Sequence, residues 1–270
     1  MKHEILRRIF LALMLILLYL PILILAVYSF TDATNIGAIR GFSLHNYVTL
    51  FTTPELTGMI AGTLALAFGS AAIATFLGTI GAIGSFYSKK RVSGAIGLLN
   101  QVPVVNADVV TGFSICILLV VVLGVSKDTF IPLVVGHVTL CAPFVYLSVM
   151  PKLRQLDPSS YEAALDLGAT PFRALTQVVI PQLVPGIISG AALAVTLSLD
   201  DYFIATYTKP ATFDTISTYV VNATKGSQTT IKTALWALST VIFAIVVLIV
   251  VLMNVRSARA EKGVIHGEDK

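Results

Sequence analysis

Six long apolar runs constrain the fold of this 270-residue chain more than any other feature of its sequence. They lie at residues 9–30, 59–87, 98–123, 130–150, 184–205 and 235–253. Each run is long enough to cross the hydrocarbon core of a bilayer as a helix. The composition agrees, since 56% of the residues are hydrophobic, 12% are charged and the mean hydropathy is +0.88. The sequence therefore predicts an all-α integral membrane protein with six transmembrane helices.

The basic residues between the runs predict the orientation of the chain. Of the 18 Lys and Arg residues, 13 lie on the side of the two termini. Because cytoplasmic loops are rich in Lys and Arg, both termini of this multi-pass protein are expected in the cytoplasm. The net charge of +4 then reflects topology and not binding to nucleic acid. The first run has no small-residue cleavage site and is too long for a signal-peptide core, so it is expected to remain as an anchor.

A polar, helix-forming segment at residues 161–181 stands out from the apolar pattern and reads YEAALDLGATPFRALTQVVIP. Just before it, Asp157 is placed to cap a helix that begins at Pro158. Glu162 is expected in the first turn of that helix, where the helix dipole favours a negative charge. Gly168 is expected to end the helix.

A second cap and proline follow at Thr170 and Pro171, and they predict a second short helix that runs to Pro181. The two helices would form a hairpin at the membrane edge. Three residues of the first helix share one face by the three-and-four spacing: Tyr161, Ala164 and Leu165. This apolar patch predicts a binding partner.

Three acidic residues fall inside the apolar runs: Asp108, Asp200 and Asp201. Charges at such positions usually face a cavity or a partner and indicate function. At about 1.5 Å per residue from the cytoplasmic ends, Asp108 would lie roughly 15 Å deep and Asp200 roughly 24 Å deep. Adjacent residues on a helix point about 100° apart, so one of Asp200 and Asp201 is expected to face substrate and the other to be structural.

Aromatic residues follow the acidic pair, including Tyr202 and Tyr207. Carboxylates at two depths beside aromatic faces suit a flexible organic cation such as a linear polyamine. In the alternative interpretation, Asp200 and Asp201 cap the end of the fifth helix or pair with Lys209. Asp108 is the substrate-path candidate with the weaker support, and it needs a partner chain, a cation or a proton to compensate its charge.

Enzymatic chemistry has little support in the sequence. The chain has no phosphate-binding Gly-x-x-x-x-Gly-Lys-Ser/Thr loop, no metal-ligand spacing and no nucleophile with a base partner, so we expect no cofactor, metal or catalytic residue. His137 is the single histidine inside a run, and a packed, hydrogen-bonded role is favoured over a proton relay. Cys116 and Cys141 fall in predicted spans, where no disulfide is expected.

The polar segment resembles the EAA loop of ABC-importer permeases. The resemblance rests on Glu-Ala-Ala at 162–164, on Gly168 and on the ending Val178, Ile180, Pro181. In that family the loop is the coupling helix that docks on a separate cytosolic ATPase, so the resemblance implies that another chain hydrolyses ATP. It assigns the docking role to Tyr161, Glu162, Ala163, Ala164, Leu165 and Gly168.

Three further motifs resemble the second permease subunit of spermidine/putrescine importers: LSLDD at 197–201, HVTLCAPFV at 137–145 and ADVVTG at 107–112. This resemblance covers nearly the whole chain. It implies a type-1 ABC transmembrane domain in the bacterial inner membrane, a second permease, an ATPase dimer and an extracytoplasmic polyamine-binding protein. Relatives often carry Ser-Pro where this chain has Asn106-Ala107, so the resemblance does not fix the local helix shape or the direction of Asp108.

The expected domain organisation is an N-terminal helix and outer loop at 1–58, a five-helix core at 59–254 with the coupling loop at 152–181, and a cytoplasmic tail at 255–270. The outer loops at 31–58 and 206–234 are expected to contact the binding protein. Three alternatives stay open: the same kind of permease with another cargo, such as ferric iron, thiamine or an opine; an ion-coupled carrier; and, with least support, an intramembrane enzyme.

Overall fold

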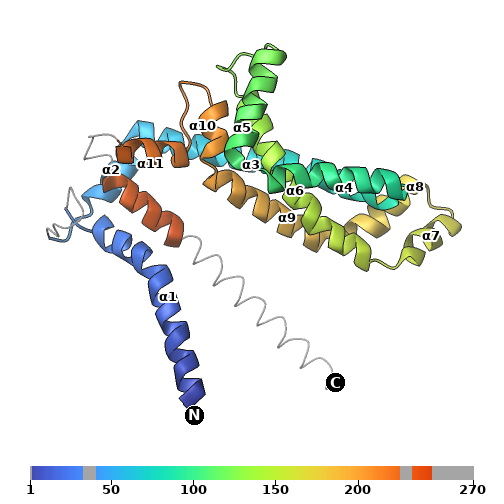
Figure 1. The fold of residues 1–270 in the computed structure, drawn as a ribbon, viewed down its shortest axis with the longest axis horizontal. Helices are drawn as coiled ribbons and strands as arrows, with labels where there is room; N and C mark the ends of the chain where they lie inside the picture. The colour runs from blue at the N-terminus through green and yellow to red at the C-terminus, as the bar shows by residue number, and fades with distance from the viewer. Residues whose placement is uncertain (1, 33–40, 226–232, 245–270) are drawn as a thin grey trace. The chain divides into compact units, whose positions relative to one another are not determined.

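The computed structural model of the chain describes residues 2–32, 41–225 and 233–244 (Figure 1). In these ranges it is helical apart from connecting segments and one isolated antiparallel bridge between Thr31 and Phe42. The elements are, in chain order, α1 (Lys2–Ser29), α2 (His45–Thr52), α3 (Pro54–Tyr87), α4 (Lys90–Val105), α5 (Asp108–Cys116), the π-helical turn η1 (Ile117–Val122), α6 (Ile131–Gln155), α7 (Pro158–Asp166), α8 (Pro171–Ala174), the π-helical turn η2 (Leu175–Val179), α9 (Ile180–Asp200), α10 (Phe203–Thr208), α11 (Ile216–Lys225) and a shorter apolar helix (Thr233–Ala244).

Four of the described helical segments are long and apolar enough to span a membrane. They are Leu6–Ser29, Pro54–Tyr87, Ile131–Gln155 and Pro171–Asp200. A fifth span is present if α4 and the α5–η1 segment count as one, although they are bent by 106°. The sixth predicted run, 235–253, and the predicted tail, 255–270, extend beyond the described residues. The all-α membrane fold is therefore confirmed, whereas the count of six is not.

Two predicted spans are not continuous helices. The run at 98–123 is broken because Asn106 and Ala107 are extended. Pro103 lies three residues before this break and supplies no backbone N–H to the helix. The run at 184–205 was expected to continue to residue 205, but α9 ends at Asp200 and a new helix, α10, begins at Phe203. Both breaks lie beside acidic residues.

The described chain divides into two compact units, Met1–Thr57 with Val220–Lys270, and Gly58–Tyr219. In the first unit, the Asn46 side chain donates hydrogen bonds to the carbonyl oxygens of Ser29 (3.1 Å) and Thr31 (3.0 Å). These bonds fix the chain that leaves α1 against the start of α2. The Tyr28 and Trp236 rings meet edge to face in the same unit, with centroids 5.6 Å apart.

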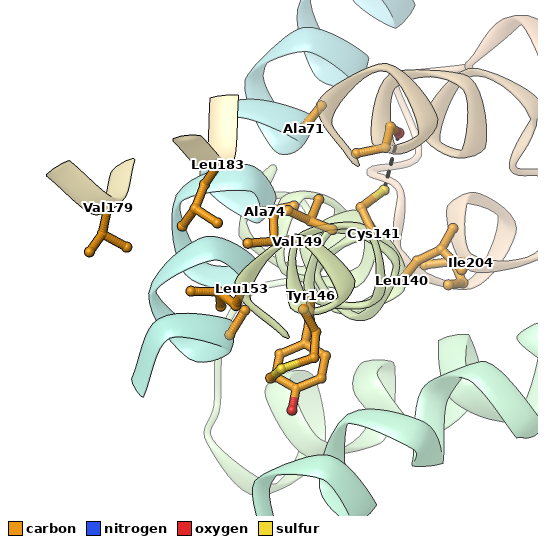
Figure 2. Packing of buried hydrophobic residues seen from close by; sticks show 14 residues of the cluster. Ala71, Ala74, Leu140, Cys141, Tyr146, Val149, Leu153, Val179, Leu183 and Ile204 are labelled. Atoms are coloured by element: carbon orange, nitrogen blue, oxygen red, sulfur yellow. Dashed lines mark hydrogen bonds between the residues drawn. The ribbon is translucent and has the colours of Figure 1, made fainter. Parts of the chain in front are cut away.

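The second unit is built around α6, which packs against α3 and α9 (Figures 1 and 2). Val145, Val149 and Leu153 of α6 are fully buried in this core, as is Leu183 of α9. Figure 2 also shows the hydrogen bond that the Cys141 thiol donates to the carbonyl oxygen of Ala194, at 3.3 Å.

Glycines allow the close approach of these helices. A Cβ on Gly78 of α3 would lie 2.7 Å from the Ala142 carbonyl oxygen and 2.7 Å from Val145 Cβ. A Cβ on Gly190 of α9 would lie 3.1 Å from Val145 Cα. Small residues let backbones approach in membranes, where apolar side chains gain little by leaving lipid. The core of the second unit therefore depends on backbone proximity as well as on side-chain burial.

Candidate functional site

The polar hairpin begins as the local sequence predicts. The Asp157 carboxylate accepts a hydrogen bond from the Ser159 amide at 3.0 Å and caps α7, with Pro158 in its first turn. Donation by the Ser159 hydroxyl, and then by its amide, lowers the pKa of Asp157 below its ordinary value. The prediction for Glu162 is wrong, because the first turn of α7 contains no acidic residue. Helix α7 begins at Pro158 as predicted, so Glu162 is its fifth residue and falls in the second turn.

Gly168 ends α7 in the left-handed conformation, with φ at +86°. Its amide donates to the Leu165 carbonyl at 2.9 Å, and the Ala169 amide donates to the Ala164 carbonyl at 3.0 Å. This bond pattern is a Schellman motif, in which glycine avoids the strain that a Cβ would meet. The predicted helix stop is confirmed.

The second helix of the hairpin also begins as predicted, since Thr170 accepts a hydrogen bond from the Arg173 amide at 3.3 Å and Pro171 follows it. Its predicted end at Pro181 is wrong. Helical structure continues through the π-helical turn η2 into α9. A widened π-helical turn directly before the proline leaves room for a ring that would otherwise crowd the preceding turn.

The two faces of α7 have different surroundings. Tyr161 is half-buried and packs against the core, with its ring 5.2 Å from that of Tyr87. Ala164 and Leu165 are half-buried on the same side. The predicted apolar patch therefore faces the chain itself, across a cavity of about 290 Å³ that Tyr161 and Leu165 help to line.

The outward side of the hairpin is formed by other residues. Glu162 and Ala163 are exposed, and two large apolar side chains project into solvent: Leu167 is 89% exposed and Phe172 is 76% exposed. Sequence reasoning missed Leu167 and Phe172. Their hydrophobic character next to the Gly168 turn is the signal that could have found them, because an apolar residue at a helix end usually packs inward.

The acidic residues lie at the helix breaks. Asp201 is in the extended link between α9 and α10, and its side chain is only 2% exposed. Its carboxylate oxygens accept hydrogen bonds from the amides of Ile204 (3.2 Å) and Ala205 (2.7 Å). Asp201 therefore caps the beginning of α10. In the predicted alternative, Asp200 and Asp201 instead capped the end of the fifth helix.

Asp200 and Asp108 are exposed. Asp200 is the last residue of α9, and Asp108 is the first residue of α5, directly after the break at Asn106 and Ala107. Both carboxylates are close enough to Asp201 to interact with it electrostatically. Both breaks therefore lie within electrostatic range of Asp201. Asp108 is at a helix start and not in mid-span as the unbroken run implied.

Of the two predicted tyrosines, Tyr202 follows Asp201 directly, and Tyr207 lies near the other end of α10. Tyr207 of α10 is half-buried and meets Phe113 of α5 edge to face, with ring centroids 5.7 Å apart. Tyr202 is half-buried against Phe203, at 5.2 Å. The predicted alternative of a pair with Lys209 is wrong, because the Lys209 ammonium lies 3.0 Å from Asp214.

A buried polar network joins Asp201 to the core. His137 is fully buried, and its Nδ1 is 2.9 Å from the Ser198 hydroxyl, which is in turn 3.1 Å from the Ser70 hydroxyl. The opposite nitrogen, Nε2, is 3.7 Å from Asp201 Oδ2. The network explains how His137 is accommodated, and it agrees with the expectation of a packed, hydrogen-bonded histidine. Sequence reasoning did not connect these residues, which lie up to 131 positions apart in the chain.

Among the described residues, no group of three His, Cys, Asp or Glu side chains could hold a metal ion. Cys116 and Cys141 are free thiols. The arrangement offers carboxylates and aromatic rings at helix breaks, and a solvent-exposed hairpin between two long apolar helices. This combination is typical of a polytopic membrane protein with a polar hairpin between two of its spans.

The chain belongs to the family of binding-protein-dependent transport system inner membrane components, the permeases of type-1 ABC importers, which it matches over residues 1–262. It is 32% identical over 250 residues to the putrescine transport system permease protein PotI of Escherichia coli K12, covering 91% of this chain and 88% of that protein. It is 29% identical over 252 residues to the spermidine/putrescine transport system permease protein PotC of Haemophilus influenzae, covering 93% and 96%.

Solved structures agree on the fold. The chain matches a bacterial ABC transporter for import of the acidic polysaccharide alginate with a TM-score of 0.71, at 19% identity over 94% of this chain and 96% of the other. It also matches a bacterial alginate ABC transporter in complex with a periplasmic protein that binds alginate pentasaccharide, with a TM-score of 0.70, at 19% identity over 92% and 93%. The predicted ABC-importer fold is confirmed, and the chain is a multi-pass membrane transport subunit.

Proposed function

We propose that this chain is one permease half of an ATP-driven importer that carries putrescine or spermidine across the bacterial inner membrane. The names of its relatives PotI and PotC support a polyamine cargo. Family membership argues against the self-contained ion-coupled carrier, because the permeases of this family serve binding-protein-dependent systems. The excess of basic residues on the terminal side supports cytoplasmic termini.

One observation carries the cargo assignment: Asp108 and Asp200 are exposed at two helix breaks that meet beside Asp201. No Lys or Arg occurs in α5, α9 or α10, and the nearest one along the chain, Lys209, is engaged by Asp214. A group of uncompensated carboxylates in a membrane protein attracts a cation.

The form of the site favours a linear organic cation. Tyr207 and Tyr202 add aromatic faces, which attract an ammonium group and cover methylene groups. Helix breaks are also where membrane transporters place their binding sites, because irregular backbone is tolerated where it lines a cavity. In this proposal Asp200 and Asp108 receive the cation at the two helix breaks, and Asp201 supports both from the interior.

The hairpin supplies the coupling to ATP. We assign the docking surface to the exposed residues of the segment from Tyr161 to Gly168, among them Glu162 and Leu167, and to Phe172, whose exposure supports contact with a separate ATPase. An ATPase dimer, a second homologous permease and an extracytoplasmic polyamine-binding protein complete the transporter. ATP binding draws the two hairpins together and opens the path outward, and hydrolysis returns it inward, as alternating access requires.

Uptake in cells tests this assignment. Cells lacking this chain and other polyamine importers are supplied with labelled putrescine, spermidine, thiamine or ferric iron, with and without the restored chain. The proposal predicts that the chain restores uptake of a polyamine and that Glu162→Ala abolishes most of it. Restored uptake of thiamine or iron alone would transfer the assignment to that cargo.

A further inference from the structure

The buried carboxylate of Asp201 has a second neighbour that its capping role does not use. His137 Nε2 lies 3.7 Å from Asp201 Oδ2, within ion-pair range but outside hydrogen-bond range. Among the described residues this nitrogen has no hydrogen-bond partner, although it is fully buried. A buried polar nitrogen without a partner is costly, so its place beside Asp201 requires an explanation.

The orientation of the imidazole is fixed from its other side. Nδ1 is paired with Ser198 on α9, and Ser198 is paired with Ser70 on α3. Three helices thus hold the ring so that Nε2 points at the Asp201 carboxylate. Cys141, one turn further along α6, bonds to Ala194 and takes no part in this chain of contacts.

The position of α10 depends on Asp201. The helix has only six residues, too few to be stable by itself, and both Asp201 oxygens bond to amides in its first turn. It also rests on two glycines: a Cβ on Gly112 of α5 would lie 2.9 Å from Ile204 Cα, and one on Gly136 of α6 would lie 2.6 Å from Ile204 Cγ2. A shift of the Asp201 carboxylate would therefore move α10 against the closely packed surface formed by Gly112 and Gly136.

The helix α10 carries Tyr207, and α6 carries the histidine. From His137, α6 runs without a break to Gln155, about 27 Å at 1.5 Å per residue, and Asp157 of the hairpin follows directly. One continuous helix, which contains Pro143 and Pro151, therefore connects the hairpin to the nitrogen that faces Asp201.

We propose that His137 is a positioning residue that holds Asp201, and through it α10 and Tyr207, in register with α6. Movement of the hairpin then reaches the cargo-facing side chains through this buried contact, together with the packing of Gly136 of α6 against Ile204 of α10. The effect of His137 on cargo rests on the proposed function, whereas its effect on α10 does not.

Two substitutions separate the two nitrogens of the ring. In His137→Gln the amide reaches the position of Nε2 and can bond to Asp201, whereas in His137→Asn the shorter amide reaches only towards Ser198. Cys141→Ala is the matched control, because it removes another buried bond between α6 and α9. Each variant is assembled in the complete transporter, with its ATPase, second permease and binding protein, in proteoliposomes.

Two properties are measured. The first is the rate of amide hydrogen exchange in the segment Phe203–Thr208. The second is the KM of putrescine uptake, with the rate of ATP hydrolysis recorded alongside it. For His137→Asn we expect exchange in α10 and the uptake KM each to rise about tenfold, because the buried Asp201 carboxylate loses the polar group beside it. For His137→Gln and Cys141→Ala we expect both to stay within about threefold of wild type. If His137→Asn does not assemble, Ser198→Ala replaces it, since it removes the group that orients the ring.

Equal behaviour of the Asn and Gln variants, or an equal effect of Cys141→Ala, would overturn the proposal. Suppose that exchange in α10 is faster in the Asn variant alone, and that the wild-type transporter imports no polyamine. This result would support positioning by His137 and reject the polyamine assignment. If the wild-type transporter imports a polyamine but exchange in α10 is not faster in the Asn variant, the polyamine assignment is supported and positioning by His137 is rejected.

Discussion

Two neighbouring carboxylates have opposite environments in this protein. Asp200 is exposed, whereas Asp201 is buried and engages two backbone amides. The sequence predicted that one would face substrate and one would be structural. The burial of Asp201 agrees with a structural role, and substrate contact by Asp200 stays a prediction. The physical cause differs from the one expected: the helix ends between the two residues, so that backbone direction and not helical rotation separates them.

Close helix packing at single glycines gives a prediction for stability. Gly78→Ala would place a Cβ against backbone and a β-branched side chain of α6, so we expect a loss of about 1–3 kcal/mol from overpacking. Gly69→Ala, on the same helix, meets no atom within 4 Å and should stabilise the fold by about 0.4–1 kcal/mol. Thermal unfolding of the two variants in the same detergent measures the difference. Equal melting temperatures would show that α3 does not pack against α6 as described.

Protonation of a single cap gives a prediction for pH. The folded-state pKa of Asp157 is depressed, so its contribution is fully present above the ordinary Asp pKa. That contribution is lost as the pH falls through the lower folded value. We expect protection of the Ser159 amide from hydrogen exchange, corrected for intrinsic rates, to be constant from pH 5 to pH 8 and to fall only below about pH 4. Asp157→Asn, which does not titrate, should remove this pH dependence; a loss of protection near pH 6 would contradict the assignment.

At the scale of elements, helix α7 separates residues that pack on the core from residues that we propose dock on the ATPase. Its inner side packs on the core through Tyr161, and its outer side exposes Glu162 and, one residue past its end, Leu167. Family resemblance assigned one role to the whole segment, because sequence spacing cannot tell which face is covered by the rest of the chain. The caps and the glycine stop were predictable because they depend on neighbours within a few residues.

The two faces predict two kinds of loss. Tyr161→Ala should lower the free energy of unfolding by roughly 1–3 kcal/mol because it removes packing against Tyr87. Leu167→Ser should change stability by less than about 0.5 kcal/mol but weaken binding to the ATPase. Melting temperature and co-purification of the ATPase, measured on both variants, separate the effects. Normal ATPase binding by Leu167→Ser would remove that residue from the docking surface.

Helix ends were the least predictable elements. The run at 98–123 was predicted as one span although it contains Asn106 and Asp108, and the structure breaks it at Asn106. The run at 184–205 continues through residues that α9 does not include. Hydropathy reports the preference of side chains for lipid. A helix end depends instead on backbone hydrogen bonds and on capping groups such as the Asp201 carboxylate. Asp201 lies at the end of a polar network whose members are up to 131 positions apart in the sequence.

At the scale of the whole molecule, the chain is a permease of a type-1 ABC importer, and its membrane class followed directly from composition and apolar runs. The arrangement of the acidic residues proposed to line the cargo path could not be predicted from composition and apolar runs. Acidic residues that were assigned to two depths in unbroken spans instead meet at two helix breaks. A permease half leaves Asp108 and Asp200 exposed, and in the proposed transporter the second permease encloses them.

Uptake kinetics of acid variants test the central claim, that carboxylates at the helix breaks receive a polyamine. Asp200→Asn and Asp108→Asn are compared with Asp214→Asn, whose carboxylate is engaged by Lys209. In the complete transporter we predict that either of the first two raises the KM for putrescine about tenfold or more, while Asp214→Asn changes it less than about twofold. An unchanged KM in Asp200→Asn and Asp108→Asn, with normal assembly, would contradict the account.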